Sequence, residues 1–139
     1  MPITVSTKIN APEELIWSCM TTPEHITQWN FASPEWCCPN ASCDVQPGGR
    51  FDFRMEATDG SMGFNFTGTY VDVQPCELLS YNLDDERFVQ VNMERKDGAV
   101  ETTQKFDPED MNPEDFQRAG WQAILDNFKQ YVENLNAAS

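Results

Sequence analysis

The sequence ends in a long amphipathic segment, and this segment constrains the fold more than any other feature of the chain. Asn112 and Pro113, followed by two acidic residues, form a typical helix start. The large apolar side chains then recur every three to five positions, at Phe116, Trp121, Leu125, Phe128, Val132 and Leu135. This spacing predicts a helix of about six turns, roughly 30 Å long, with Gln117, Lys129 and Glu133 outside its apolar stripe. Such a stripe has to be buried against another element.

Most of the chain before this helix alternates apolar and polar residues, a period of two that predicts β-strands. We expect strands near residues 3–9, 50–57, 62–73, 78–83, 87–94 and 99–106. Turn dipeptides such as Asp59-Gly60 separate them. Two short helices are expected after the first strand, because Pro12 and Pro23 each stand just before acidic residues.

This order of elements predicts an α+β fold. A strongly bent antiparallel sheet could bury its apolar face against the stripe of the C-terminal helix and leave a space between them. At 139 residues, the chain is expected to form one domain over residues 1–139.

Charge and cysteine usage exclude several classes of function. The chain carries 23 acidic and 9 basic residues, a net charge of −14, with no basic run, so it should repel nucleic acids and anionic membranes. No segment approaches the roughly 20 apolar residues that cross a bilayer, and the N-terminus shows no signal-peptide pattern. The five cysteines are not spaced like a secreted disulfide scaffold, so we expect a cytoplasmic protein with reduced thiols.

Residues 29–40, WNFASPEWCCPN, hold aromatic and thiol groups in a stretch that its Pro, Ser and Asn content predicts to be a loop. A metal site, a redox pair and a pocket wall are the three candidates. Adjacent Cys37 and Cys38 cannot easily point at one tetrahedral centre, even with Cys43 and His25 as further ligands. A disulfide between the two neighbours would be strained. We therefore expect reduced thiols and no metal here.

Several stretches, in order along the chain, resemble the START-like (SRPBCC) superfamily, and more narrowly its branch related to the C-terminal domain of the activator of Hsp90 ATPase. They are Ala11-Pro12-Glu13, Trp17, TPEHI (22–26), Trp29, Asp44, PGGRF (47–51), DGS (59–61), GTY (68–70) and GWQAILDNF (120–128). The resemblance implies a helix-grip fold, in which a curved antiparallel sheet wraps around the long C-terminal helix over a hydrophobic cavity. Members of the superfamily bind lipids, sterols, plant hormones and polyketides, and some are enzymes. A bacterial source would suit so compact a member.

Side chains on the predicted inner faces are the candidates to line that cavity. They are Trp29, Phe31, Trp36, Phe53, Phe64, Phe66, Tyr70, Tyr81, Gln90, Trp121, Leu125 and Phe128. We expect the loop to act as a lid, with Trp29 and Trp36 mostly buried and Phe31 beside them. Among the others, the two tyrosines and Gln90 would orient a ligand through hydrogen bonds. The alternative is that these aromatic residues form a plain, filled core.

Three functions stay open at this point. The first is non-covalent binding of a small hydrophobic or aromatic molecule. The second is a protein-interaction module resembling the Hsp90 activator domain, with a chaperone as partner, and the third is a cyclase- or lyase-like enzyme. With His25 as the only histidine and no phosphate-binding loop, the sequence predicts no catalytic residue and no cofactor. It leaves open whether the protein is a monomer or a dimer.

Overall fold

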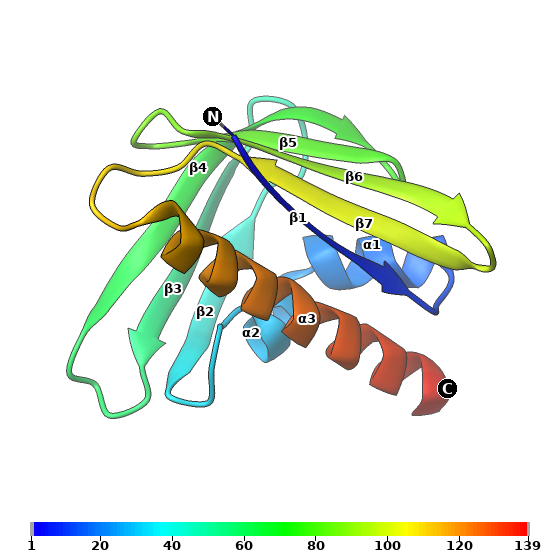
Figure 1. The fold of residues 1–139 in the computed structure, drawn as a ribbon, viewed down its shortest axis with the longest axis horizontal. Coiled ribbons are helices and arrows are strands. Elements are labelled where there is room, and N and C mark those ends of the chain that lie inside the picture. The colour runs from blue at the N-terminus through cyan, green and yellow to red at the C-terminus, as the bar shows by residue number, and fades with distance from the viewer. Residues whose placement is uncertain (1, 139) are drawn as a thin grey trace.

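The structure is a computed structural model that describes residues 2–138. Its elements follow the order of one strand, two short helices, six strands and a long helix (Figure 1). The helices are α1 (Glu13–Thr21), α2 (Pro23–Trp29) and α3 (Glu114–Ala138). The strands are β1 (Ile3–Ile9), β2 (Trp36–Cys43), β3 (Arg50–Ala57), β4 (Gly63–Gln74), β5 (Leu78–Leu83), β6 (Phe88–Lys96) and β7 (Ala99–Phe106).

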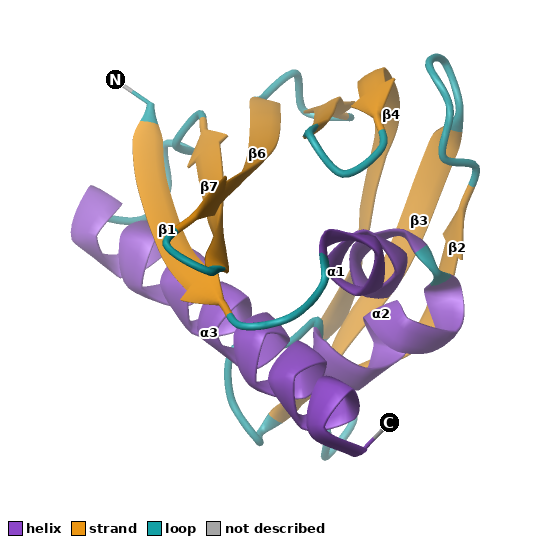
Figure 2. Cartoon of the chain, turned by 90° about the vertical axis from the view of Figure 1, so that its right-hand side faces the viewer, coloured by secondary structure: helices purple, strands orange, loops and turns teal. Residues whose placement is uncertain are grey.

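The strands form one curved sheet in the order β1-β7-β6-β5-β4-β3-β2, and every neighbouring pair is antiparallel. Figure 2 shows how the sheet bends: β1, β7 and β6 lie on one side, β2, β3 and β4 lie on the other, and α3 runs across below them. At the edges of the sheet, α3 packs against β1 and α2 packs against β2. The predicted α+β helix-grip fold is confirmed.

The core lies between the inner face of this sheet and the middle of α3. Phe106 of β7 and Val89 of β6 face each other across the ladder, and both are buried. From the helix, Leu125, Phe128 and Val132 are buried in the same cluster, at the three- and four-residue spacing read from the sequence. The middle of the apolar stripe therefore packs as predicted.

The start of α3 departs from the predicted stripe. Phe116 is 67% exposed, although its spacing places it on the apolar side. Gln117, expected outside the stripe, is only 6% exposed. Its buried amide is acceptable because it is fully hydrogen-bonded to the chain that leads into the helix, as described below.

One half of the predicted loop is a strand. Residues 36–43 form β2, the last strand of the sheet, so the loop shrinks to residues 30–35 and Trp29 ends α2. The pairing of β2 with β3 shifts register between Cys37 and Asn40, around Pro39. An edge strand with a bulge tolerates proline, because no ladder bond needs a donor there. The Pro and Asn content therefore misled the sequence prediction.

The free edge of β1 is covered by polar side chains of α3. Alternate backbone carbonyls along β1, and just beyond it, accept hydrogen bonds from the helix. The pairs are Arg118 with Thr4, Gln122 with Ser6, Lys129 with Lys8 and Asn136 with Asn10. An uncovered strand edge invites pairing with other chains. The polar side of α3 thus closes this edge while its apolar side fills the core.

Tight turns between strands form where the sequence predicts them. Gly60 and Gly98 adopt φ of 77° and 82°, which suit glycine in the β3–β4 and β6–β7 turns. Gly68 of β4 is needed for space instead, since a Cβ there would come within 2.7 Å of the Phe51 ring. The ring of Phe51 thus packs directly over the backbone of β4.

Candidate functional site

A cavity of about 400 Å³ lies between the inner face of the sheet and the first half of α3. This volume is within the range of small-molecule sites. Its walls come from the α2–β2 region, strands β3, β4, β5 and β7, and the chain around the start of α3. The lining residues are Trp29, Asn30, Ala32, Phe53, Met55, Phe64, Phe66, Tyr81, Arg87, Gln104, Glu109, Asn112, Phe116, Gln117, Gly120, Trp121 and Ile124. We refer to this space as the cavity.

Half of the predicted site residues line the cavity. They are Trp29, Phe53, Phe64, Phe66, Tyr81 and Trp121. Their rings come from five elements, and Phe66 meets Trp121 edge-on with centroids 6.2 Å apart. The sheet and α3 therefore contribute aromatic groups to one space.

Three other predicted site residues lie in the core instead. Leu125 and Phe128 are buried in the helix–sheet core, and Trp29 packs edge-on against Phe128 with centroids 4.7 Å apart. Tyr70 is buried against Phe51, at 5.2 Å between ring centroids. These side chains support the cavity from behind and do not line it.

The last three predicted residues do not line the cavity. Gln90 alternates with buried neighbours on β6, so it points to the outer face, where it donates a hydrogen bond to Asn92 at 2.9 Å. Trp36 packs beside Phe64, with 6.2 Å between ring centroids, and both Trp36 and Phe31 are partly buried.

The two tryptophans of the expected lid are mostly buried, as the sequence predicted. Trp29 and Trp36 are neither fully buried nor freely exposed. The Trp29 indole N–H donates to the carbonyl of Cys19 at 2.9 Å, which ties the end of α2 to α1. Asn127 of α3 donates to the Trp29 carbonyl, also at 2.9 Å. Trp29 is thus held in place by both neighbouring helices.

Several cavity residues were not predicted. In β7, Gln104 shares the inward parity of buried Phe106. Just before β6, Arg87 shares the parity of Val89, so strand alternation could have located both. Around the first turns of α3, helical spacing could have added Gly120 and Ile124 to Trp121. Met55, two residues after Phe53 in β3, could have been located in the same way. The lining residues Asn30, Ala32, Glu109 and Asn112 lie in loops, and their positions depend on how those loops fold.

Gln117 organises the entrance to α3. Its Oε1 accepts from the backbone N–H of Glu109 at 2.9 Å. Its Nε2 donates to the carbonyls of Glu109 and Asn112 at 3.0 and 2.8 Å. Glu109 in turn accepts from both the backbone N–H and the side-chain amide of Asn112. This network fixes the segment before α3, which forms part of the cavity wall.

The cavity wall contains one neutral hydroxyl, that of Tyr81, and one guanidinium, that of Arg87. Burial raises the pKa of the Tyr81 hydroxyl well above its usual range, so the group stays protonated and can donate a hydrogen bond. Arg87 forms an ion pair in which its Nε lies 2.8 Å from Oδ2 of Asp85. The wall thus combines mostly aromatic surface with a few polar groups, which is typical of ligand sites.

The sequence profile described as "Activator of Hsp90 ATPase homolog 1-like protein" matches residues 10–133. The chain belongs to this AHSA1-like family. The family lies within the START/SRPBCC superfamily, so the resemblance read from the sequence is confirmed. The comparison with curated proteins gives no match.

Solved structures agree with this assignment. The AHSA1-like protein from Aeromonas hydrophila is 40% identical, with a TM-score of 0.91, and the match covers 97% of this chain and 94% of that one. Chr148 from Cytophaga hutchinsonii is also 40% identical, with a TM-score of 0.83 and coverage of 99% and 95%. Protein NE0264 from Nitrosomonas europaea, at 16% identity, a TM-score of 0.86 and coverage of 99% and 97%, shares the fold.

The cysteines of this AHSA1-like chain are unpaired and mostly shielded. Burial raises the pKa of both Cys19 and Cys38 to about 11, and it also raises that of Cys43. Such thiols are protonated at neutral pH and are poor nucleophiles. Within residues 2–138, no group of three or more His, Cys, Asp or Glu side chains is arranged to hold a metal ion.

The only histidine of the AHSA1-like chain joins two helices. Nδ1 of His25 in α2 lies 2.6 Å from the Tyr131 hydroxyl in α3, and the rings meet edge-on. His25 does not line the cavity. The structure therefore brings no histidine to the candidate site.

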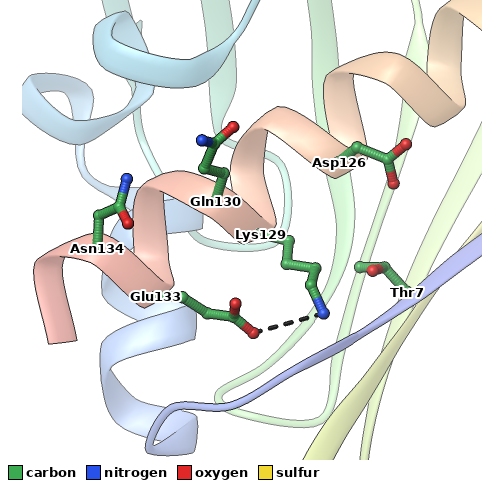
Figure 3. A pocket seen from close by; sticks show the side chains of 6 residues that line it. All are labelled: Thr7, Asp126, Lys129, Gln130, Glu133 and Asn134. Carbon is green, nitrogen blue, oxygen red and sulfur yellow. Dashed lines mark ion pairs between the residues drawn. The ribbon is translucent and has the colours of Figure 1, made fainter. Parts of the chain in front are cut away.

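A second, polar groove runs along α3 beside β1 (Figure 3). Lys129 and Glu133 form an ion pair there at 3.5 Å. Glu133 also accepts from the backbone N–H of Asn10, and Lys129 donates to the carbonyl of Lys8. Because these charged groups already bind the backbone, the groove serves to attach α3 to β1.

Among the described helices, none is long and apolar enough to cross a membrane.

Proposed function

We propose that this AHSA1-like protein binds a small, largely apolar and partly aromatic molecule in the cavity. The supporting observation is the cavity itself, about 400 Å³ between sheet and helix with six predicted aromatic residues in its wall. The cavity is open to solvent, since its lining residues Phe64 and Phe116 are 50% and 67% exposed, so a ligand can enter it. Burial of apolar ligand surface would supply roughly 25 cal/mol per Å².

Gly120 offers a direct test. It lines the cavity, and a Cβ added there would have no heavy atom within 4 Å apart from its own helix backbone. Gly120→Phe should therefore fill the cavity without straining α3, whereas Gly120→Ala keeps most of the space. Alanine also favours a helix by about 1 kcal/mol over glycine, so the control should fold at least as well as wild type.

The probe is N-phenyl-1-naphthylamine, a neutral aromatic dye that fluoresces when it enters an apolar site. We expect it to bind wild type and Gly120→Ala, and to lose at least ten-fold in affinity in Gly120→Phe. Circular dichroism and thermal unfolding would establish that all three proteins are folded. Absence of dye binding to wild type, or equal binding to both variants, would show that the cavity is not a ligand site.

A second candidate function is protein interaction, and the family description together with exposed apolar side chains favours it. Met62, Phe64 and Phe116 are 61%, 50% and 67% exposed. The test is whether the purified protein binds Hsp90 and stimulates its ATPase. A Phe116→Ser variant should reduce the effect, and no stimulation by wild type would exclude this function.

The cytoplasm is the proposed location, since five unpaired cysteines suit a reducing compartment. We also propose that residues 1–139 act as one domain. Limited proteolysis tests this proposal, because a single domain should resist cleavage between β7 and α3.

A further inference from the structure

Three polar side chains line the cavity from the inner side of the sheet. Tyr81 of β5 is paired with Val89 of β6, and Gln104 of β7 is paired with Val91, so both lie on the face that the buried valines occupy. Arg87 precedes Val89 by two residues and shares its parity. All three side chains line the cavity. Polar groups on an otherwise apolar inner face need partners.

The protein itself provides few of these partners. Among the described residues, none forms a hydrogen bond with the Tyr81 hydroxyl or the Gln104 side-chain amide. Arg87 uses its Nε for the ion pair with Asp85, which leaves Nη1 and Nη2 without a bonded partner in the described chain. Three donor groups at the cavity wall are therefore available to an occupant.

The one positive charge among the described lining residues suits an anion in this position. Arg87 is the only cation among the described lining residues, and its side chain is 22% exposed, while that of its partner Asp85 is 56% exposed and lies toward solvent. Glu109 is the other charged lining residue, and its Oε1 already accepts two hydrogen bonds from Asn112. A guanidinium edge, a hydroxyl donor and an amide donor in the wall of one cavity suit a carboxylate or sulfonate.

We infer that the molecule bound in the cavity carries one anionic group on an aromatic or otherwise apolar body, with Arg87, Tyr81 and Gln104 holding that group. The inference rests on the proposed function, since it names the class of ligand for the same cavity. The apolar body would lie against Phe53, Phe66 and Trp121. A neutral molecule of the same shape would leave the guanidinium edge unpaired.

Two dyes that differ mainly in charge test the inference. 8-Anilinonaphthalene-1-sulfonate carries a sulfonate on nearly the same skeleton as the neutral N-phenyl-1-naphthylamine. Arg87→Gln should weaken binding of the sulfonate about ten-fold or more, as expected for loss of a hydrogen-bonded charge, and change binding of the neutral dye less than two-fold. Raised salt should weaken only the sulfonate.

Arg95→Gln is the matched control. It removes the same charge from a residue that pairs with Glu13 and does not line the cavity, so the affinity for either dye should stay within two-fold. Gly120→Phe should abolish binding of both dyes, which locates them in the cavity. Tyr81→Phe should weaken the sulfonate by a few-fold without affecting the neutral dye.

The outcomes separate the two proposals. If the neutral dye binds but Arg87→Gln leaves the affinity for the sulfonate unchanged, the polar groups are merely hydrated and the anionic ligand is ruled out, while the proposed function stands. If neither dye binds wild type, the proposed function fails and the inference fails with it. A loss of both dyes in folded Arg87→Gln would also overturn the inference, because charge would not be the cause.

Discussion

The indole of Trp121 in α3 lies face to face with the ring of Phe106 in β7, with centroids 3.9 Å apart and planes inclined by 10°. The Phe106 ring of this pair belongs to the buried core, since Phe106 is fully buried. The other ring forms cavity wall, because Trp121 also lines the cavity. The same contact therefore joins the helix to the sheet and shapes the candidate site.

Replacing Trp121 should destabilise the fold. Trp121→Ala removes the stacked ring and is expected to lower the free energy of unfolding by about 3 kcal/mol, the lower end for a large aromatic because the side chain is half-buried. Trp121→Phe keeps a stacked ring and should cost about half as much. Urea denaturation measures both variants, and equal stabilities would show that the stacked pair contributes little.

The buried Gln117 should be needed for stability and for the cavity wall. Gln117→Leu removes three hydrogen bonds and leaves backbone groups of Glu109 and Asn112 without partners, so we expect a loss of about 2–4 kcal/mol. Exposed Gln130→Leu on the same helix should change stability by less than about 0.5 kcal/mol. Chemical denaturation compares them, and a similar effect of both substitutions would contradict the structural role of Gln117.

Thr102 offers a stabilising substitution. It is fully buried in β7, and its hydroxyl is the one buried side-chain oxygen or nitrogen within residues 2–138 that has no hydrogen-bond partner. Thr102→Val replaces the hydroxyl with a methyl group of similar size and should stabilise the protein by about 1 kcal/mol. The neighbouring Thr103→Val, on the other face, should have a smaller effect. A destabilised Thr102→Val would indicate a partner for the hydroxyl.

The buried thiols predict how stability depends on pH. In the folded protein, burial raises the pKa of Cys38 from its ordinary 9.0 to about 11, so the folded state holds its proton more tightly than the unfolded state. The stabilisation that this protonated thiol contributes is therefore fully present below pH 9, and it is lost as the pH rises toward 11. Cys19 acts in the same direction.

Urea denaturation at pH 7, 9 and 10.5 checks this prediction. The contribution of these thiols to the free energy of unfolding of wild type should change little between pH 7 and 9. It should be smaller at pH 10.5. Cys38→Ala removes one of the titrating groups and should lose less stability between pH 9 and 10.5 than wild type does. If this variant loses as much stability between pH 9 and 10.5 as wild type does, folding does not raise the pKa of the Cys38 thiol.

Local pattern alone determined most of the fold. Strand alternation and the turn glycines predicted β1 and β3 through β7, and the stripe from Trp121 to Val132 predicted α3 with its correct buried side. These signals are readable because a period of two or of 3.6 residues records which side of each element is buried. Together with the family motifs, they were sufficient for the helix-grip fold.

Only the tertiary structure decided β2 and the composition of the cavity. Residues 36–43 carry Pro39 and become a strand because β3 supplies a pairing edge and a bulge accommodates the proline. The sequence pattern likewise placed Phe116 in the apolar stripe and Gln117 outside it. In the structure Phe116 is exposed and Gln117 is buried, because the segment before α3 returns to bind the Gln117 amide.

Tertiary packing also decided the surroundings of Arg87 and Gln104. Their parity shows that they face inward, but whether an inward polar residue meets a core or a cavity depends on how closely α3 approaches the sheet at that point. This distance is set by side chains from distant parts of the chain, above all Trp121 against Phe106. The sequence by itself therefore determined the elements and their buried faces, and tertiary packing determined where those faces leave space for a ligand.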